Sequence, residues 1–121
     1  MKKFMLCATT LLLFEKGAYS ADFTCASGDT ACLIAAINVA NSNSEDNTIF
    51  LQAGEYILGV VNNNTDGPNG LPSITGRMSI RGPDGVGSTI QRNMDSPGFR
   101  IFHVASQGSL TLDWLALTGN V

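Results

Sequence analysis

The sequence predicts an all-β solenoid, in which short strands coil around one apolar interior and a short helix covers its first end. Three observations favour this fold class. Apolar residues alternate with polar ones through residues 99–119 and slip phase once, at Asp113-Trp114. Gly, Pro, Asn and Ser interrupt the chain at short intervals, as a protein of many short strands requires. Residues 29–41 have the length and apolar content of a buried helix.

Residues 1–21 are typical of a secretory signal peptide. Lysines at the start precede an apolar run that is too short to cross a bilayer, and small residues follow it. We expect cleavage near Ser20 or Ala21, which leaves residues 22–121 as one exported domain without a transmembrane helix. Its destination would be the medium, the periplasm or the cell surface. The alternative is that the apolar run is an ordinary buried strand or helix.

Cysteine content agrees with export. Cys7 would leave with the signal peptide, so Cys25 and Cys32 remain, and two cysteines in an oxidising compartment are expected to pair. The pair lacks the C-x-x-C spacing of redox motifs. A zinc site is the other alternative, but His103 and two cysteines fall short of the usual four ligands. We predict a structural disulfide that clamps the start of the helix.

The helix predicted over residues 29–41 begins at Asp29 or Thr30, either of which can cap its first turn. Its apolar residues cover more than half of its circumference, and Asn38 and Asn41 leave only a narrow polar stripe. We expect this helix to cover the open end of the coil, because exposed sheet ends promote aggregation. An amphipathic surface helix is the alternative.

Residues 48–58 read as two strands divided at Ala53-Gly54. Residues 62–70, rich in Asn, follow as a loop that we expect to bury nothing. Its oxygen ligands suit calcium, but Asn and Asp also form ordinary turns and the spacing fits no EF-hand.

Further strands are predicted downstream. Ile57, Ile80 and Phe102 lie at intervals that suggest one solenoid turn. The predicted strands are residues 73–76, 78–82, 88–92 and those on either side of the Asp113-Trp114 corner. The final coil would leave leucines and a backbone edge exposed, so we expect the chain to be a truncated part of a longer protein.

The order of its segments makes this chain resemble a known family. The segments are, in order, the Cys-containing segment, the helix ACLIAAINVAN and the strand segments DNTIFLQAGEYIL, LPSITGRMSIRG, STIQR and FRIFHVASQGSLTLDWLALTG. The family is the N-terminal region of secreted bacterial proteins with a right-handed parallel β-helix, the pectate-lyase-like fold. The helix is similar to the cap of the CSLREA-type N-terminal segment, with Leu33 kept and its Arg-Glu pair replaced by Ile34 and Ala35.

The resemblance implies several possible activities, since relatives include polysaccharide lyases, glycoside hydrolases, tail-spike adhesins and surface proteins. Such lyases use calcium held by acidic residues with an Arg or Lys base, and such hydrolases use paired aspartates. No two acidic residues alternate along one predicted strand here. We therefore assign no catalytic, cofactor-binding or metal-binding residue, and calcium is expected only for a lyase.

Four side chains remain as candidate ligand contacts. Trp114 offers an indole on which a sugar could stack, or which packs over a neighbouring coil. Arg92 and Arg100 lie near strand ends, where solvated guanidinium groups are expected. His103 is placed in a strand without an acidic partner, as a general base or as a surface side chain.

The net charge of the protein limits the kinds of partner that it is expected to bind. The net charge is −3 with 7 Lys plus Arg, which disfavours nucleic acid because such partners need a clustered basic face. Two functions remain. The first is a noncatalytic secreted or surface scaffold that contacts carbohydrate or another cell-envelope component. The alternative is the start of a polysaccharide lyase or glycoside hydrolase.

Overall fold

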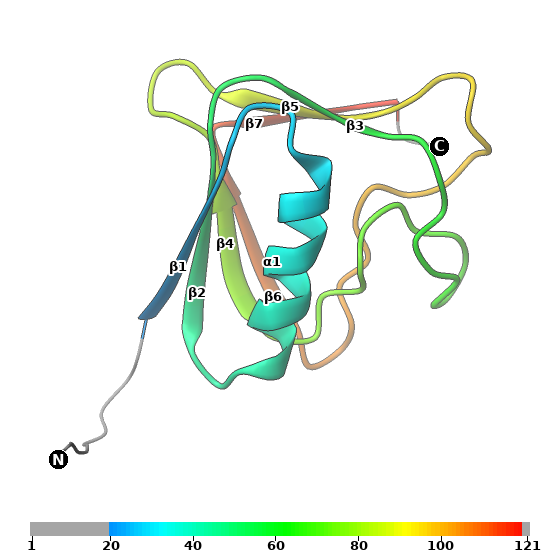
Figure 1. Cartoon of the computed structure of the whole chain (residues 1–121). Coiled ribbons are helices and arrows are strands. Elements are labelled where there is room, and N and C mark those ends of the chain that lie inside the picture. Colours follow the sequence, from blue (N-terminus) through cyan, green and yellow to red (C-terminus); the bar gives the residue numbers. More distant parts are fainter. Residues whose placement is uncertain (1–19, 120–121) are drawn as a thin grey trace, which may run out of the picture.

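The computed structural model describes residues 20–119, which form one helix and seven strands (Figure 1). The predicted signal peptide lies almost wholly outside the described residues, and its expected cleavage points, Ser20 and Ala21, are the first two residues of the first strand. The elements are β1 (Ser20–Cys25), α1 (Thr30–Ser42), β2 (Asp46–Leu51), β3 (Glu55–Leu58), β4 (Arg77–Arg81), β5 (Ser88–Arg92), β6 (Ser109–Asp113) and β7 (Leu115–Thr118).

The strands form two parallel sheets, with strand orders β1-β2-β4-β6 and β3-β5-β7. All five strand pairs are parallel. The chain passes from the first sheet to the second in each of three successive coils, β2 to β3, β4 to β5, and β6 to β7. The prediction of a mostly β protein with one short helix is therefore confirmed, and its sheets are parallel.

Strand register stacks apolar residues of successive coils on one another. Ile49 pairs with Ile80, and Ile80 pairs with Leu112, along the first sheet. Along the second sheet, Tyr56 pairs with Ile90. Because side chains alternate along a strand, these positions share the inward face, while their neighbours face outward. All of them are fully buried except Leu112, which lies in the third coil and is 38% exposed.

The expected repeat of Ile57, Ile80 and Phe102 is wrong. Ile57 pairs with Gln91 and its side chain is 48% exposed, so it lies outside the apolar interior that holds Ile80. Each coil is longer than that spacing because an irregular third side, residues 59–76 and 93–108, connects the second sheet back to the first.

This third side contains single bridges. Ile74, in a predicted strand, bridges Val104 in parallel. Asn69, in the predicted loop over residues 62–70, bridges Arg100 in parallel. The expectation that residues 62–70 bury nothing is also wrong, because Asn69 is fully buried. Its side-chain amide donates to the carbonyl oxygen of Thr65 at 2.8 Å, so the loop folds around its own polar core.

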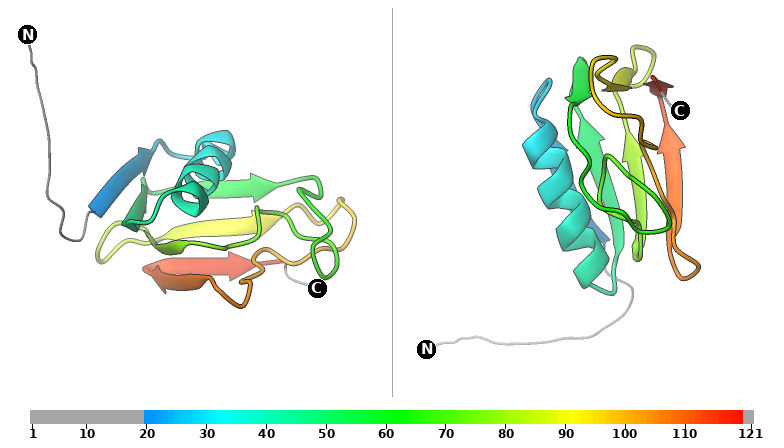
Figure 2. Two further views of the ribbon diagram at one scale, coloured as in Figure 1. Left: turned by 90° about the horizontal axis from the view of Figure 1, so that it is seen from below. Right: turned by 90° about the vertical axis from the view of Figure 1, so that its right-hand side faces the viewer.

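Helix α1 covers the first coil at the end of the stack opposite β6 and β7 (Figure 2). The side chain of Asp29 accepts from the backbone N–H of Cys32 at 3.0 Å, as predicted for an N-cap. Four residues of the helix are buried against the coil: Leu33, Ala36, Ile37 and Ala40.

Asn41 does not belong to a polar stripe on α1. Its Oδ1 accepts from the backbone N–H groups of Thr75 and Gly76 at 2.8 and 3.0 Å. Its amide donates to the carbonyl oxygen of Ser73 at 2.8 Å. One asparagine thus satisfies three backbone groups that no sheet pairs and fastens the helix to the third side.

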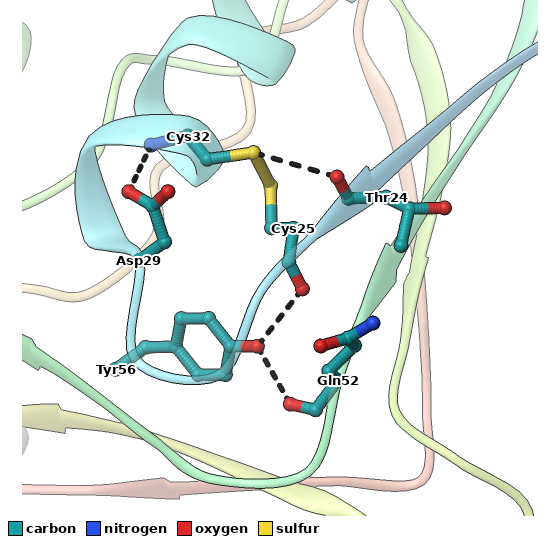
Figure 3. The surroundings of a disulfide bond; sticks show 6 residues. All are labelled: Thr24, Cys25, Asp29, Cys32, Gln52 and Tyr56. Atoms are coloured by element: carbon teal, nitrogen blue, oxygen red, sulfur yellow. Dashed lines mark hydrogen bonds between the residues drawn. A yellow bond between two sulfur atoms is a disulfide. The ribbon is translucent and has the colours of Figure 1, made fainter.

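A disulfide joins Cys25, the last residue of β1, to Cys32 in the first turn of α1, with their Cα atoms 5.6 Å apart (Figure 3). Tyr56 lies beside it and is fully buried. Its hydroxyl donates to the carbonyl oxygen of Gln52 at 2.6 Å and lies 3.4 Å from that of Cys25. The covalent bond and this tyrosine hold β1, the helix start and the first corner together.

Replacing Ile80 with Ala should lower the free energy of unfolding by about 2–5 kcal/mol, because Ile80 is fully buried at the centre of the stack. Urea unfolding followed by circular dichroism measures this change. Val60→Ala is the matched control, since Val60 is 74% exposed, and should change stability by less than about 0.5 kcal/mol. Equal effects of the two substitutions would contradict the assigned interior.

Because the pKa of the buried Tyr56 is raised, we expect the protein to lose stability in alkali. Burial raises the pKa of Tyr56 above its ordinary value of 10.0, a backbone hydrogen bond with Gly28 opposes the rise, and the charge of Asp29 adds to it. The unfolded chain therefore releases this proton at a lower pH than the folded chain does, so the contribution of Tyr56 to stability is fully present below pH 10.0 and decreases as the pH rises above it.

The test compares wild type with Tyr56→Phe by urea unfolding at about pH 8 and about pH 11. At the lower pH the wild type should be more stable by about 1 kcal/mol, the net contribution of the lost hydroxyl hydrogen bonds. This difference should shrink at the higher pH. A difference that stays constant would show that Tyr56 ionises equally in both states.

Candidate functional site

The corner between β6 and β7 consists of one residue, Trp114, which has a left-handed φ of 54°. A bulky residue rarely adopts this conformation, and such outliers concentrate at functional positions. The carbonyl oxygen of Trp114 accepts from the N–H of Ser88 in the coil before, at 3.1 Å, which fixes the corner. The predicted phase slip is thus a bend made by a single left-handed residue.

A hollow of about 520 Å³ lies beside this corner. Trp114 lines it and is 47% exposed, so its side chain is not fully packed over its neighbours. The outward segment of the second coil contributes Val86, which is 73% exposed. The second sheet contributes Glu55 and Thr89, which supply a carboxylate and a hydroxyl at the same surface.

Arg92 is buried, in contrast to the expected solvated group at a strand end. It is 8% exposed, and it donates to the carbonyl oxygens of Ser96 and Gly119. Its guanidinium also lies 6.0 Å from the centre of the Phe99 ring. In β5 the alternation of Ser88, Ile90 and Arg92 places all three on the buried face, a signal already present in the sequence.

Arg100 fastens the loop over residues 62–70. Its Nε donates to Oδ1 of Asn69 at 2.9 Å. Its Nη2 donates to the carbonyl oxygens of Thr65 and Asp66 at 3.1 and 2.7 Å. This arrangement makes Arg100 a support for the loop, and it also lines a separate hollow of about 410 Å³ with Asp66 and Phe99.

The two remaining arginines of the described residues are paired with acids on the outer face of the first sheet. Arg77 contacts Asp46 at 2.8 Å, and Arg81 contacts both Asp84 and Asp113. Residues 20–119 contain no lysine. Every positive side chain in this range, apart from a protonated histidine, is therefore engaged with groups of the protein itself.

His103 has partners that the sequence analysis missed. It lies outside any strand, one residue before the Val104 bridge, which differs from its predicted place. Its Nδ1 is 2.6 Å from Oγ of Ser73, and its Nε2 is 3.1 Å from Oδ2 of Asp66. The expectation of no acidic partner is wrong, because the third side brings together residues 30 and 37 positions away.

These three side chains form one hydrogen-bonded series. When Nδ1 accepts from the Ser73 hydroxyl, Nε2 carries the ring proton and donates to the Asp66 carboxylate. The His103 side chain is 13% exposed and that of Asp66 is 79% exposed. The series therefore runs from a nearly buried imidazole to the solvent.

The described residues were found to hold neither a metal-binding cluster nor a membrane-spanning helix. Within residues 20–119, no group of three or more His, Cys, Asp or Glu side chains is placed to hold a metal ion. No helix in the same range has the length and apolar character needed to cross a membrane.

Comparison with known proteins adds no relative. No family matches the sequence, no curated protein matches it, and no solved structure matches the chain. The Trp114 hollow and the series Ser73–His103–Asp66 are two candidate sites among the described residues.

Arg92→Met should lower the free energy of unfolding by about 1–3 kcal/mol, because it removes a buried guanidinium that donates to partly buried carbonyl oxygens. Arg77→Met, which breaks an exposed ion pair, is the matched comparison and should cost at most about 1 kcal/mol. Thermal and urea unfolding measure both changes. A larger loss from Arg77→Met would contradict the structural role of Arg92.

Proposed function

We propose that the chain is an exported, noncatalytic scaffold built as the N-terminal cap and first coils of a right-handed parallel β-helix, and that it contacts carbohydrate at the Trp114 hollow. The parallel pairing of all five strand pairs supports the fold. Connections between parallel strands are right-handed in nearly all proteins, which supports the hand. The disulfide supports export, since such bonds persist in oxidising compartments.

The observation that carries the function is that Trp114, a half-exposed aromatic residue, lines the hollow. The C–H face of a pyranose ring is apolar, and an aromatic ring offers it a flat apolar surface. Glu55 and Thr89 lie at the same hollow and can accept hydrogen bonds from sugar hydroxyls. A rigid apolar platform with a few polar groups is the usual composition of a binding site for a small molecule.

The charge of the hollow favours a neutral sugar over a uronate. Glu55 is the charged residue that lines it, and the four arginines of the described residues are engaged elsewhere. A uronate carboxylate would meet like charge without a cation to pair with, which disfavours binding. The proposed ligand is therefore a neutral polysaccharide of the cell envelope or its surroundings.

Trp114→Ala should weaken binding of a soluble neutral β-glucan by about tenfold, because the stacking surface is lost. Affinity electrophoresis in gels containing the glucan measures the change. Val60→Ala, an exposed apolar residue outside the hollow, should migrate as wild type. Parallel gels with polygalacturonate should give no retardation.

Three results would count against the proposal. Unchanged retardation of Trp114→Ala would remove the corner from the site. Preference for polygalacturonate would contradict a neutral ligand. Release of reducing sugar, or a calcium-dependent rise in ultraviolet absorbance on polygalacturonate, would favour the alternative, a polysaccharide lyase or glycoside hydrolase.

A further inference from the structure

We infer that Ser73 is an activated nucleophile, with His103 as its general base and Asp66 as the residue that positions the base. The hydroxyl of Ser73 lies 2.6 Å from Nδ1 of His103, within reach for direct proton transfer. The carboxylate of Asp66 accepts from the opposite ring nitrogen at 3.1 Å, which holds the imidazole in the tautomer that can accept a proton. This function is additional to the proposed carbohydrate contact and does not depend on it.

The backbone holds the nucleophile and base in place. The N–H of Ile74 donates to the carbonyl oxygen of His103 at 2.8 Å, and the N–H of Ala105 donates to that of Ile74 at 2.9 Å. These bonds join the segments of Ser73 and His103 side by side. Asn41 of α1 holds the carbonyl oxygen of Ser73 at 2.8 Å from the other direction. The two reacting groups are therefore positioned by structure that does not itself react.

Asp66 is positioned independently of its carboxylate. Its carbonyl oxygen accepts from Arg100 at 2.7 Å, and its φ of 55° lies in the left-handed region. Asp tolerates this conformation better than most residues, as does Asn. Asp66→Asn should therefore keep the loop and remove only the negative charge beside His103.

The chemistry expected is acyl transfer from an activated ester. Oγ of Ser73 attacks the ester carbonyl carbon, its proton passes to Nδ1 of His103, and the bond from carbon to the leaving oxygen breaks. The leaving group departs as an alkoxide or phenoxide, and the imidazolium returns its proton to that group or to solvent. The product is an ester on Ser73, with no change of oxidation state.

The surroundings of Ser73 predict a single transfer instead of rapid turnover. The N–H of Ile74 is used by His103, and the N–H groups of Thr75 and Gly76 are used by Asn41. The three amides that follow Ser73 are thus not free to stabilise an oxyanion, an interaction that efficient hydrolysis needs. We therefore expect an acyl group to remain on Ser73 once it has been transferred.

The test treats the disulfide-bonded protein with p-nitrophenyl acetate and locates the acetyl group by mass spectrometry of its peptides. We expect nitrophenolate to be released once per chain, with the acetyl group on Ser73 and none on Ser73→Ala. His103→Gln should slow the labelling about a hundredfold, and Asp66→Asn about tenfold.

Ser106→Ala and Trp114→Ala are the controls. Ser106 is an exposed serine whose hydroxyl faces Gln107, so its removal should leave the labelling of Ser73 unchanged. Trp114→Ala should also label normally, which separates this site from the carbohydrate hollow. Urea unfolding of each variant checks that it is folded.

The inference is overturned if Ser73 reacts no faster than Ser106, or if folded Asp66→Asn labels at the wild-type rate across the pH range. Repeated turnover, with many nitrophenolates released per chain, would contradict the expected absence of free oxyanion donors next to Ser73.

Discussion

In-register parallel pairing is the constraint on which the rest of this structure depends. Because each strand pairs with the strand one coil away, Ile49, Ile80 and Leu112 lie in one column, and the interior is built from such columns. Parallel strands need both their interior face and their ends covered. Helix α1 covers one end with four buried residues, and the disulfide fixes where that helix begins.

The same pairing makes the third side a place where distant residues meet. Successive coils return through irregular segments that need not match in length, so their polar side chains contact across coils. Three sets of contacts arise in this way. They are the series Ser73–His103–Asp66, the hydrogen bonds of Arg100 to the loop over residues 62–70, and the hydrogen bonds of Asn41 to residues 73–76. The sheets are regular and supply rigidity, whereas the proposed nucleophile Ser73 and its partners lie where regular strand pairing stops.

Local patterns in the sequence were enough to predict the helix, the strands β2 to β7 and the bend at Asp113-Trp114, but not β1, and the strand predicted over residues 73–76 is only a single bridge. Alternation is a property of neighbours, so the phase slip at Trp114 is visible without a structure. The buried side of β5 was equally visible, but a charged side chain at Arg92 was read as solvated. The partners of His103 were not predictable, since its contacts depend on which loops face each other and no periodic signal encodes that. The spacing of Ile57, Ile80 and Phe102 misled because each coil includes an irregular third side and is therefore longer than that spacing.

The Trp114 hollow spans strands from all three coils, β3, β5 and β7. The sugar proposed to bind there would contact segments that are far apart in the sequence and are neighbours in the second sheet. Because these segments meet only in the folded chain, such a ligand would raise the free energy of unfolding by mass action, and the increase would grow with ligand concentration.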